Sequence, residues 1–354
     1  MNILFISRQS DSVPLDFKLI ANKLQEEHEV VFSSKRVEFS LGSFLSYIPI
    51  FFEQIRLIRH ADVVIIDSYC MPVSLFKYPN KPKVIQIWHA IGLMKKTGYS
   101  ILGKNEGGHG SLIMRFLKVH HNYDYIFASS ESCRQSIAEL FDYSEDHIII
   151  QTLPRIDNLF SDTYKKKTTK RLQEKYSFLV NGKKNILYAP TWRSDNDELF
   201  ANVIDWSNTF DHNKYNLIIK FHPKTLKQFY DSGIELADVI VLEKETSANL
   251  AIVCDYLVSD YSSLIYEFIS LEKPVFYFSF DLDGYVDERD FYFDYVKEIP
   301  GDIYKTALDL NRAIDKECYN LEKANQFFKK YVNISDKGCA NQIANFIEGL
   351  ETVN

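Results

Sequence analysis

Short apolar runs alternate with amphipathic stretches along most of this chain, and this alternation constrains the fold more than any other feature of the sequence. A helical pattern spans residues 17–27 between the first two runs. The runs of the first half read NILFIS, EVVFSS, ADVVIID, KVIQIW and YDYIFAS. Strands that alternate with helices are typical of βαβ units with a parallel sheet. The first half therefore predicts an open α/β domain.

A second series of the same kind follows a lysine-dense stretch, YKKKTTKRLQEKYSFLVNGKK, which has little apolar periodicity. Its apolar runs read NILYAPT, NLIIKFH, DVIVLE, YLVSD and PVFYFS, and a long polar helix pattern begins near Leu321. We place the domain boundary between residues 160 and 184. The expected domains are residues 1–170 and residues 171–354, and the last helix can return to the first domain. Both domains are expected to be Rossmann-like.

Composition and charge exclude several classes of protein. The chain has 354 residues, of which 46% are hydrophobic, which is ample for two packed cores. Its 41 Lys and Arg and 48 Asp and Glu give a net charge of −7, so overall charge does not favour nucleic acid as a partner. The five cysteines are too widely spaced for a CxxC pair or a zinc ribbon, and reduced thiols fit a cytoplasmic protein.

Membrane insertion is not favoured by the sequence either. The first residues, MNILFISRQ, indicate a core strand and lack the pattern of a signal peptide. The longest uncharged stretch, Phe39–Phe52, has 14 residues, short of a spanning helix. With Arg56, Arg59 and His60 behind it, this segment could lie on an anionic membrane surface or form a buried core helix.

Ligands of open α/β sheets bind beyond the carboxyl ends of the strands, so we looked for reactive residues directly after each apolar run. The first such residue is His89 in QIWHAIGLMKKTG, followed by Lys95 and Lys96. A histidine suits a general base, and two lysines could hold an anion near it. A histidine at a helix start with solvated lysines would have the same sequence.

The second position is His222 in KFHPK, where the following proline restricts the turn. This imidazole could bind a phosphate oxygen or protonate a leaving group. A histidine that caps the strand is the alternative.

The third position is the turn SDYSS, where Ser262 and Ser263 precede a helix. Backbone N–H groups and hydroxyls at a helix start can bind phosphate, although ordinary capping needs the same residues. Glu267, one turn further on, could accept hydrogen bonds from ribose hydroxyls.

Two further segments contain candidate anion-binding residues. Thr191 and Arg193 follow the run NILYAPT, where arginine could bind pyrophosphate bidentately or form a surface salt bridge. Arg289 lies in the acidic and aromatic segment DLDGYVDERDFYFDY. The chain contains no GxxxxGK[ST], GxGxxG or HExxH motif, and we expect no protein metal site.

Six strings, in order and at similar spacing, resemble the CDP-glycerol glycerophosphotransferases that build teichoic acids. They are WHAIGLMKKTG, LPRIDNLF, ILYAPTWRSD, IIKFHPK, CDYLVSDYSSLIYEF and FDLDGYVDERDFYFDY, within residues 84–301. The resemblance implies a GT-B-like fold, in which two Rossmann-type domains face a central cleft. It also implies transfer of glycerol phosphate or ribitol phosphate from a CDP-polyol to a hydroxyl of a lipid-linked or polymeric acceptor, with release of CMP, at the cytoplasmic face of the membrane.

The resemblance also implies roles for the residues named above. His89 corresponds to a general base and His222 to a catalytic histidine beside the pyrophosphate. The donor-site positions are Thr191, Arg193, Ser262, Ser263, Glu267 and Arg289, and the acceptor-side positions are Lys95 and Lys96.

The sequence leaves two other functions open. One is a GT-B glycosyltransferase that uses a nucleotide sugar, and the other is a noncatalytic assembly factor at the membrane. No obligatory cofactor is expected, although Mg²⁺ could arrive with the donor pyrophosphate.

Overall fold

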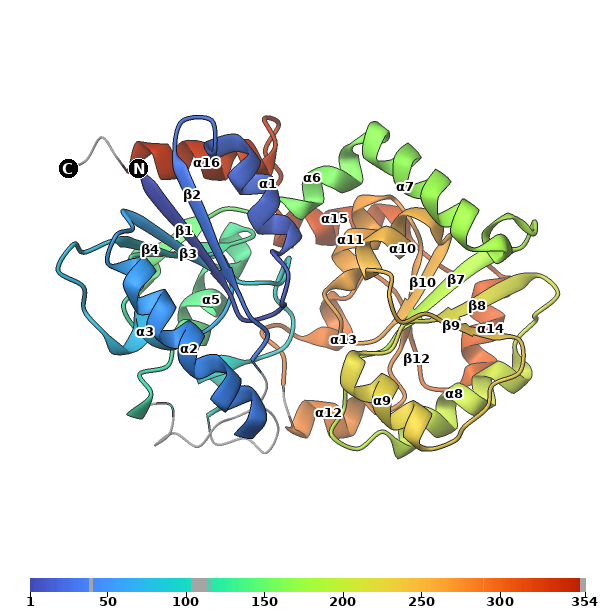
Figure 1. The fold of residues 1–354 in the computed structure, drawn as a ribbon. Coiled ribbons are helices and arrows are strands. Elements are labelled where there is room, and N and C mark those ends of the chain that lie inside the picture. The colour runs from blue at the N-terminus through green and yellow to red at the C-terminus, as the bar shows by residue number, and fades with distance from the viewer. Residues whose placement is uncertain (38–40, 103–113, 115, 289, 351–354) are drawn as a thin grey trace. The chain divides into compact units, whose positions relative to one another are not determined.

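The computed structural model describes residues 1–37, 41–102, 114, 116–288 and 290–350 (Figure 1). Contacts divide the chain into two compact units, residues 1–157 with 331–354 and residues 158–330. The division falls before helix α7 (Asp162–Lys175), whereas the sequence suggested a boundary at residue 170, inside that helix. The lysine-dense stretch is helical and packs against α10 (Ser247–Val253), which assigns it to the second unit.

The first unit contains a six-stranded parallel sheet in the order β2-β1-β3-β4-β5-β6. Its strands are β1 (Asn2–Ser7), β2 (Glu29–Ser34), β3 (Val63–Ile66), β4 (Lys83–Gln86), β5 (Tyr125–Ala128) and β6 (Ile148–Ile150). Five of the six residues of β1 and all four of β3 are buried. Helices cover both faces of such a sheet, which explains why its central strands read as continuous apolar runs.

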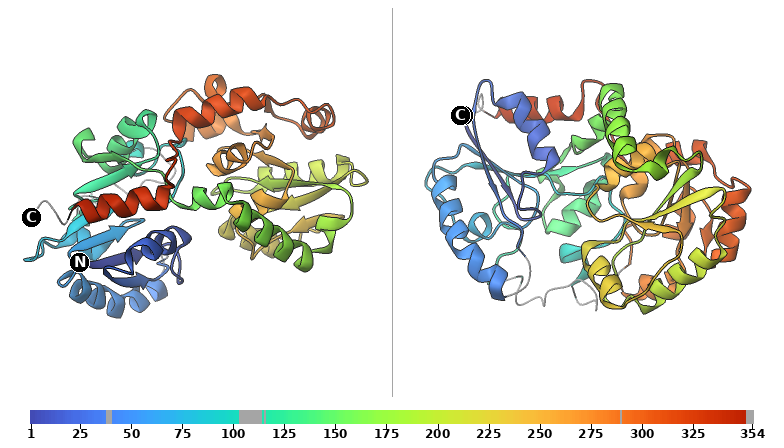
Figure 2. Two further views of the ribbon diagram at one scale, coloured as in Figure 1. Left: turned by 90° about the horizontal axis from the view of Figure 1, so that it is seen from above. Right: turned by 45° about the vertical axis from the view of Figure 1, so that its right-hand side comes forward.

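The helices of the first unit follow the expected alternation. They are α1 (Leu15–Leu24), α2 (Leu41–Ile58), α3 (Met71–Leu75), α5 (Arg134–Phe141), the start of α6 (Arg155–Phe160) and α16 (Cys339–Gly349), with 3-10 turns at Gly98–Ile101, Glu131–Cys133 and Glu145–His147. Helix α16 packs against α1, and both are visible beside the sheet in Figures 1 and 2.

The second unit repeats the architecture, with the order β12-β11-β10-β7-β8-β9. Its strands are β7 (Lys184–Ala189), β8 (Tyr215–Ile219), β9 (Val239–Val241), β10 (Tyr256–Ser259), β11 (Val275–Phe278) and β12 (Ile303–Tyr304). Besides α7 and α10, its helices are α8 (Asp197–Thr209), α9 (Pro223–Asp231), α11 (Leu264–Ser270), α12 (Leu282–Glu288), α13 (Tyr295–Glu298), α14 (Ala307–Asp315) and α15 (Leu321–Tyr331), with a 3-10 turn at Ser177–Val180. The core includes Tyr188, Trp206 and Phe278, whose rings contact one another.

The C-terminal region differs from the single long helix that the sequence suggested, because α15 and α16 are separate helices. The segment between them is tied to the first unit. The Ser129 hydroxyl donates to the Tyr331 carbonyl at 2.8 Å, and the Asn333 N–H donates to the Ser129 carbonyl at 2.7 Å. The Asp157 carboxylate accepts from the N–H groups of Cys339 and Ala340, both at 2.9 Å, and so caps α16.

Each sheet has one point at which the strand order changes direction. In the first unit the chain goes from β1 to β2 on one side and then to β3 on the other. In the second unit β8 and β9 lie on one side of β7, and β10 lies on the other. Ligands of open α/β sheets bind beside the carboxyl ends of the strands at these switch points.

Candidate functional site

The switch point of the first unit is held together by polar side chains. Ser7, the last residue of β1, donates its hydroxyl hydrogen to Asp67 at 2.6 Å. Asp67 directly follows β3 and also accepts from the Ser68 hydroxyl at 2.9 Å. Burial raises the pKa of the Asp67 carboxyl, and the two hydroxyl hydrogen bonds act in the opposite direction. These hydrogen bonds therefore hold the main chain after β3 in place, next to the carboxyl end of β4.

His89 lies at that neighbouring strand end, just beyond β4. Its Nδ1 is 3.3 Å from the carbonyl oxygen of Asp67. A carbonyl oxygen can only accept, so Nδ1 carries a hydrogen in this contact. In the neutral ring the lone pair then lies on Nε2. This is the arrangement that a general base requires.

The protonation of His89 favours the same role. Neighbouring protein atoms lower its pKa to about 4, mainly by desolvation and less by the cationic Arg155, whereas the hydrogen bond to Asp67 acts in the other direction. The residue as a whole is nevertheless exposed. A lowered pKa leaves the ring neutral near pH 7.

The turn that presents His89 is conformationally unusual. Trp88 has a φ of 61°, in the left-handed region that bulky residues rarely adopt. Its N–H donates to the buried side chain of Gln86 at 2.9 Å, and its ring packs against Phe141 and His89. Backbone strain of this kind is commonly retained at functional sites.

Arg155 is a site residue that the sequence analysis did not identify, although it lies in the string LPRIDNLF. Its guanidinium donates to the main-chain carbonyl of His89 and lies 3.6 Å from Asp16. The Arg155 N–H donates to the same Asp16 at 2.9 Å. Arg155 therefore joins α1, the His89 turn and the start of α6. Asp16 is 139 positions away in sequence, so no local pattern could have revealed the pairing.

The switch point of the second unit contains a buried charge cluster around Arg193. Its guanidinium contacts Asp260 at 2.9 Å and forms a bidentate pair with Asp281. It also donates to the Thr191 carbonyl at 2.7 Å. The side chain is only 8% exposed, so these contacts occupy the guanidinium. The structure thus favours a role for Arg193 in holding Asp260, Asp281 and the Thr191 turn together. Direct binding of phosphate by Arg193 would require these ion pairs to break.

Asp260 connects this cluster to the two neighbouring turns. Its carboxylate accepts the N–H of Thr191 at 2.9 Å and that of Tyr261 at 2.7 Å. It follows β10, whereas Thr191 follows β7. The sequence analysis did not identify Asp260 or Asp281, although Asp260 is the residue directly after β10.

His222 begins α9 with its side chain as the cap. Its Nδ1 accepts the N–H of Lys224 at 3.2 Å, so the neutral ring carries its hydrogen on Nε2. The residue is exposed. His222 therefore caps α9, whereas the structural alternative in the sequence was a histidine that caps the preceding strand. Its tautomer is the opposite of that of His89.

The remaining predicted donor residues lie at the second unit's strand ends. Ser262 and Ser263 precede α11 and are half-buried, and the Ser262 hydroxyl accepts the Leu264 N–H at 3.3 Å. Thr191 is buried, and Glu267 is half-buried within α11. Arg289 lies outside the described residues.

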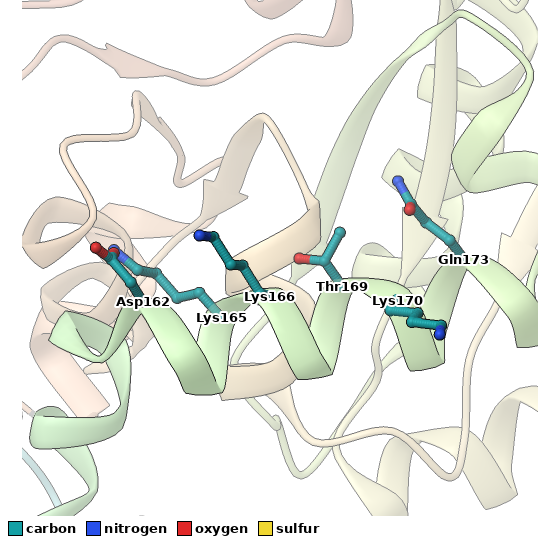
Figure 3. Close-up of a pocket in the computed structure, with 6 residues that line it drawn as sticks. All are labelled: Asp162, Lys165, Lys166, Thr169, Lys170 and Gln173. Atoms are coloured by element: carbon teal, nitrogen blue, oxygen red, sulfur yellow. The ribbon is translucent and has the colours of Figure 1, made fainter.

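The predicted acceptor-side lysines, Lys95 and Lys96, are half-buried in the loop after His89. Another lysine-rich feature is a shallow hollow of about 400 Å³ on α7, lined by Asp162, Lys165, Lys166, Thr169, Lys170 and Gln173. All six side chains come from one helix (Figure 3). Since it is away from the strand ends, we do not assign the donor to it.

One group of potential metal ligands occurs among the described residues. Ligand atoms of Glu27, His28 and Glu348 lie within 4.8 Å of one another. Glu27 and His28 precede β2, whereas His89 follows β4, so the group lies at the opposite edge of the parallel sheet. It could not hold a cation on a pyrophosphate at the carboxyl edge.

Two units, each a parallel α/β sheet with polar groups at its switch point, define a class of protein by its fold, the GT-B-like α/β proteins. A family model described as CDP-Glycerol:Poly(glycerophosphate) glycerophosphotransferase matches residues 1–349. The chain belongs to this family of enzymes.

Individual relatives agree with this assignment. The teichoic acid ribitol-phosphate primase of Bacillus spizizenii is 26% identical over 99% of this chain and 91% of its own length. The teichoic acid ribitol-phosphate polymerase TarK of Staphylococcus aureus is 30% identical over 79% of this chain but 55% of its own length. The chain thus spans most of the primase and about half of that polymerase.

A solved structure supports the fold. The wall teichoic acid polymerase TagF superimposes with a TM-score of 0.73 over 98% of this chain and 88% of that chain, at 21% identity. The predictions of the family, of an enzyme and of a GT-B-like α/β fold are confirmed. The roles of individual residues stay predictions.

Proposed function

We propose that this enzyme transfers glycerol phosphate or ribitol phosphate from a CDP-polyol to a hydroxyl of a lipid-linked or polymeric cell-surface acceptor, releasing CMP. The observation that carries the proposal is the tautomer of His89, whose Nε2 lone pair suits removal of a hydroxyl proton. Family membership supports the donor class, because the family description names CDP-glycerol.

The proposed chemistry is a phosphoryl transfer. The acceptor hydroxyl gives its proton to Nε2 of His89 as its oxygen attacks the phosphorus next to the polyol. The bond between that phosphorus and the CMP oxygen breaks, and CMP leaves with the electron pair. Negative charge grows on the phosphoryl and leaving oxygens, where preorganised donors are most effective.

The second unit supplies suitable donors for that charge. The Nε2–H of His222 and the turn around Thr191, Ser262 and Ser263 are assigned to the donor phosphates. Arg193 is assigned to the network that holds Asp260 and the Thr191 turn in place. Mg²⁺ bound to the donor pyrophosphate would neutralise further charge, and no described residue is assigned to hold it.

Product analysis tests this function. Purified enzyme is incubated with CDP-glycerol, CDP-ribitol or UDP-sugars and a lipid-linked acceptor, and CMP and UDP are separated by chromatography. We expect acceptor-dependent CMP release that His89→Ala lowers about 10²–10⁴-fold, the usual contribution of a general base. His147→Ala is the matched control and should retain wild-type activity. UDP release would instead indicate a glycosyltransferase, and no nucleotide release would favour the assembly factor.

We also propose that the enzyme meets its acceptor on the cytoplasmic membrane surface through α2. Among the described residues, no helix is both long and apolar enough to cross a bilayer. However, α2 buries Tyr47 and Ile58 and exposes Leu45, Ile48 and Phe52, which are spaced along one helical face. The exposed cation Arg56 lies in the last turn of this helix and the exposed Arg59 directly follows it, so the complementary surface is an anionic membrane.

Vesicle cosedimentation tests the membrane proposal. The double variant Leu45→Glu, Phe52→Glu should lose most binding to vesicles that contain phosphatidylglycerol, because two carboxylates replace apolar contacts. Leu308→Glu is the matched control, since Leu308 is 55% exposed and Leu45 56% exposed. Wild-type binding by the double variant would reject α2 as the membrane contact.

A further inference from the structure

Arg8 lies at the switch point of the first unit and forms no ion pair with any residue that the structure describes. It directly follows β1, and one terminal nitrogen, Nη1, donates to the Tyr69 carbonyl at 2.9 Å. Its Nε is buried and has no hydrogen-bond partner, and no carboxylate among the described residues forms an ion pair with this guanidinium. Burying part of a cation without an anion is unfavourable, and an anionic ligand would remove that cost.

Two tyrosine rings fix the Arg8 guanidinium. Its Cζ is 5.4 Å from the ring centroid of Tyr69 and 5.7 Å from that of Tyr47. The Tyr47 hydroxyl donates to Gln54, and the Tyr69 hydroxyl donates to the Leu117 carbonyl. Both hydroxyls are thus engaged elsewhere, and the aromatic groups hold the cation without neutralising it.

Asp67, an acidic side chain at the same switch point, is engaged by other groups. Asp67 is 4% exposed and accepts from Ser7 and Ser68, as described above. Because Nη1 of Arg8 is bound to the Tyr69 carbonyl, the unassigned donors lie on the edge formed by Nε and Nη2. Two parallel N–H groups on one edge match two oxygens of a phosphate.

The position of Arg8 relates it to His89. Arg8 contacts the carbonyl of Tyr69, and His89 contacts that of Asp67, two residues earlier in the same segment. Two residues of chain span at most about 7 Å, and this segment bends at residues 67 and 68. A ligand with its hydroxyl at His89 could therefore reach Arg8 with a group only a few bonds away.

We propose that Arg8 binds a phosphate of the acceptor, next to the hydroxyl that attacks the donor. This inference rests on the proposed function and narrows its acceptor to chains whose terminal unit already carries a phosphate. A neutral glycan end would leave the guanidinium without its anion.

Paired acceptors test this proposal. One is a short alkyl chain carrying a single glycerol phosphate unit, and the other is the same chain carrying glycerol alone. Wild-type enzyme should use the phosphate-bearing acceptor better. Arg8→Gln should raise the acceptor KM about 10–100-fold for that compound only, the usual effect of losing a charged hydrogen-bond pair. The donor KM should be unchanged, and Arg8→Lys should restore part of the effect.

The controls separate the possible failures. Arg134→Gln is the matched control, because Arg134 is paired with Glu131 on the surface. Equal losses with both acceptors, unchanged KM values or an altered donor KM would each overturn the role of Arg8. If wild-type enzyme released no CMP at all, the proposed function would fail. Equilibrium binding of the phosphate-bearing compound to wild type and Arg8→Gln would still decide the role of Arg8, with equal affinities rejecting it.

Discussion

The two site histidines differ in which ring nitrogen carries the hydrogen, and main-chain groups determine the difference. A carbonyl acceptor places the hydrogen of His89 on Nδ1, whereas an N–H donor places that of His222 on Nε2. One ring can therefore accept a proton at Nε2, and the other can donate from it. Strand-end positions in the sequence predicted both residues but could not predict the tautomers, which depend on distant or turn-specific main-chain partners.

A prediction for a single residue concerns Arg155. Its positive charge contributes to lowering the pKa of His89, so Arg155→Gln should raise that pKa. A general base works only when unprotonated, and the acid limb of the kcat profile should therefore move to higher pH. Loss of the contact with the His89 carbonyl should also lower kcat about 10-fold, the cost of a charged hydrogen bond, with the donor KM unchanged.

Comparison of two variants identifies Arg155 as a positioning residue. Arg155→Lys keeps the charge and should keep the acid limb close to its wild-type position, and Arg134→Gln should change neither parameter. A lower kcat in Arg155→Gln without movement of the acid limb would show that Arg155 only supports the fold.

Among the secondary-structure elements, helix α7 was the hardest to predict from the hydrophobic pattern of the sequence. Only Thr168 and Leu172 are buried along it, so the helix has almost no apolar stripe for a sequence pattern to reveal. Its stability comes from other contacts. The Ser161 hydroxyl caps its first turn, and Glu245 binds both Arg171 and Lys175 from a loop far along the chain.

Helix α16 provides a prediction at the scale of elements. Asp157→Ala removes the acceptor of two N–H groups in its first turn, and the loss of a helix cap costs about 0.5–2 kcal/mol. We expect faster amide hydrogen exchange in α16, by about 10-fold. Asp157→Asn keeps one acceptor and should be intermediate, and exposed Asp146→Ala is the control. Unchanged exchange in Asp157→Ala would exclude this capping role.

For the whole molecule, the sequence predicted both sheets because their central strands are buried on both faces and appear as uninterrupted apolar runs. The grouping of residues into units was harder to infer. The apolar face of α16, which includes Ile343 and Ile347, could cover any sheet. Its assignment to the first unit depends on Asp157, Ser129 and α1, none of which is close to it in sequence.

Because residues 331–349 complete the first unit, the second unit is an insertion within it. A ribosome releases the six strands of the first sheet before the second unit, but it releases α16 only after the second unit. The inserted unit has all its strands before α16 emerges, and domains generally fold as units during synthesis. The second unit can thus reach its native state before the first unit, which contains His89 and is complete only when α16 has been made.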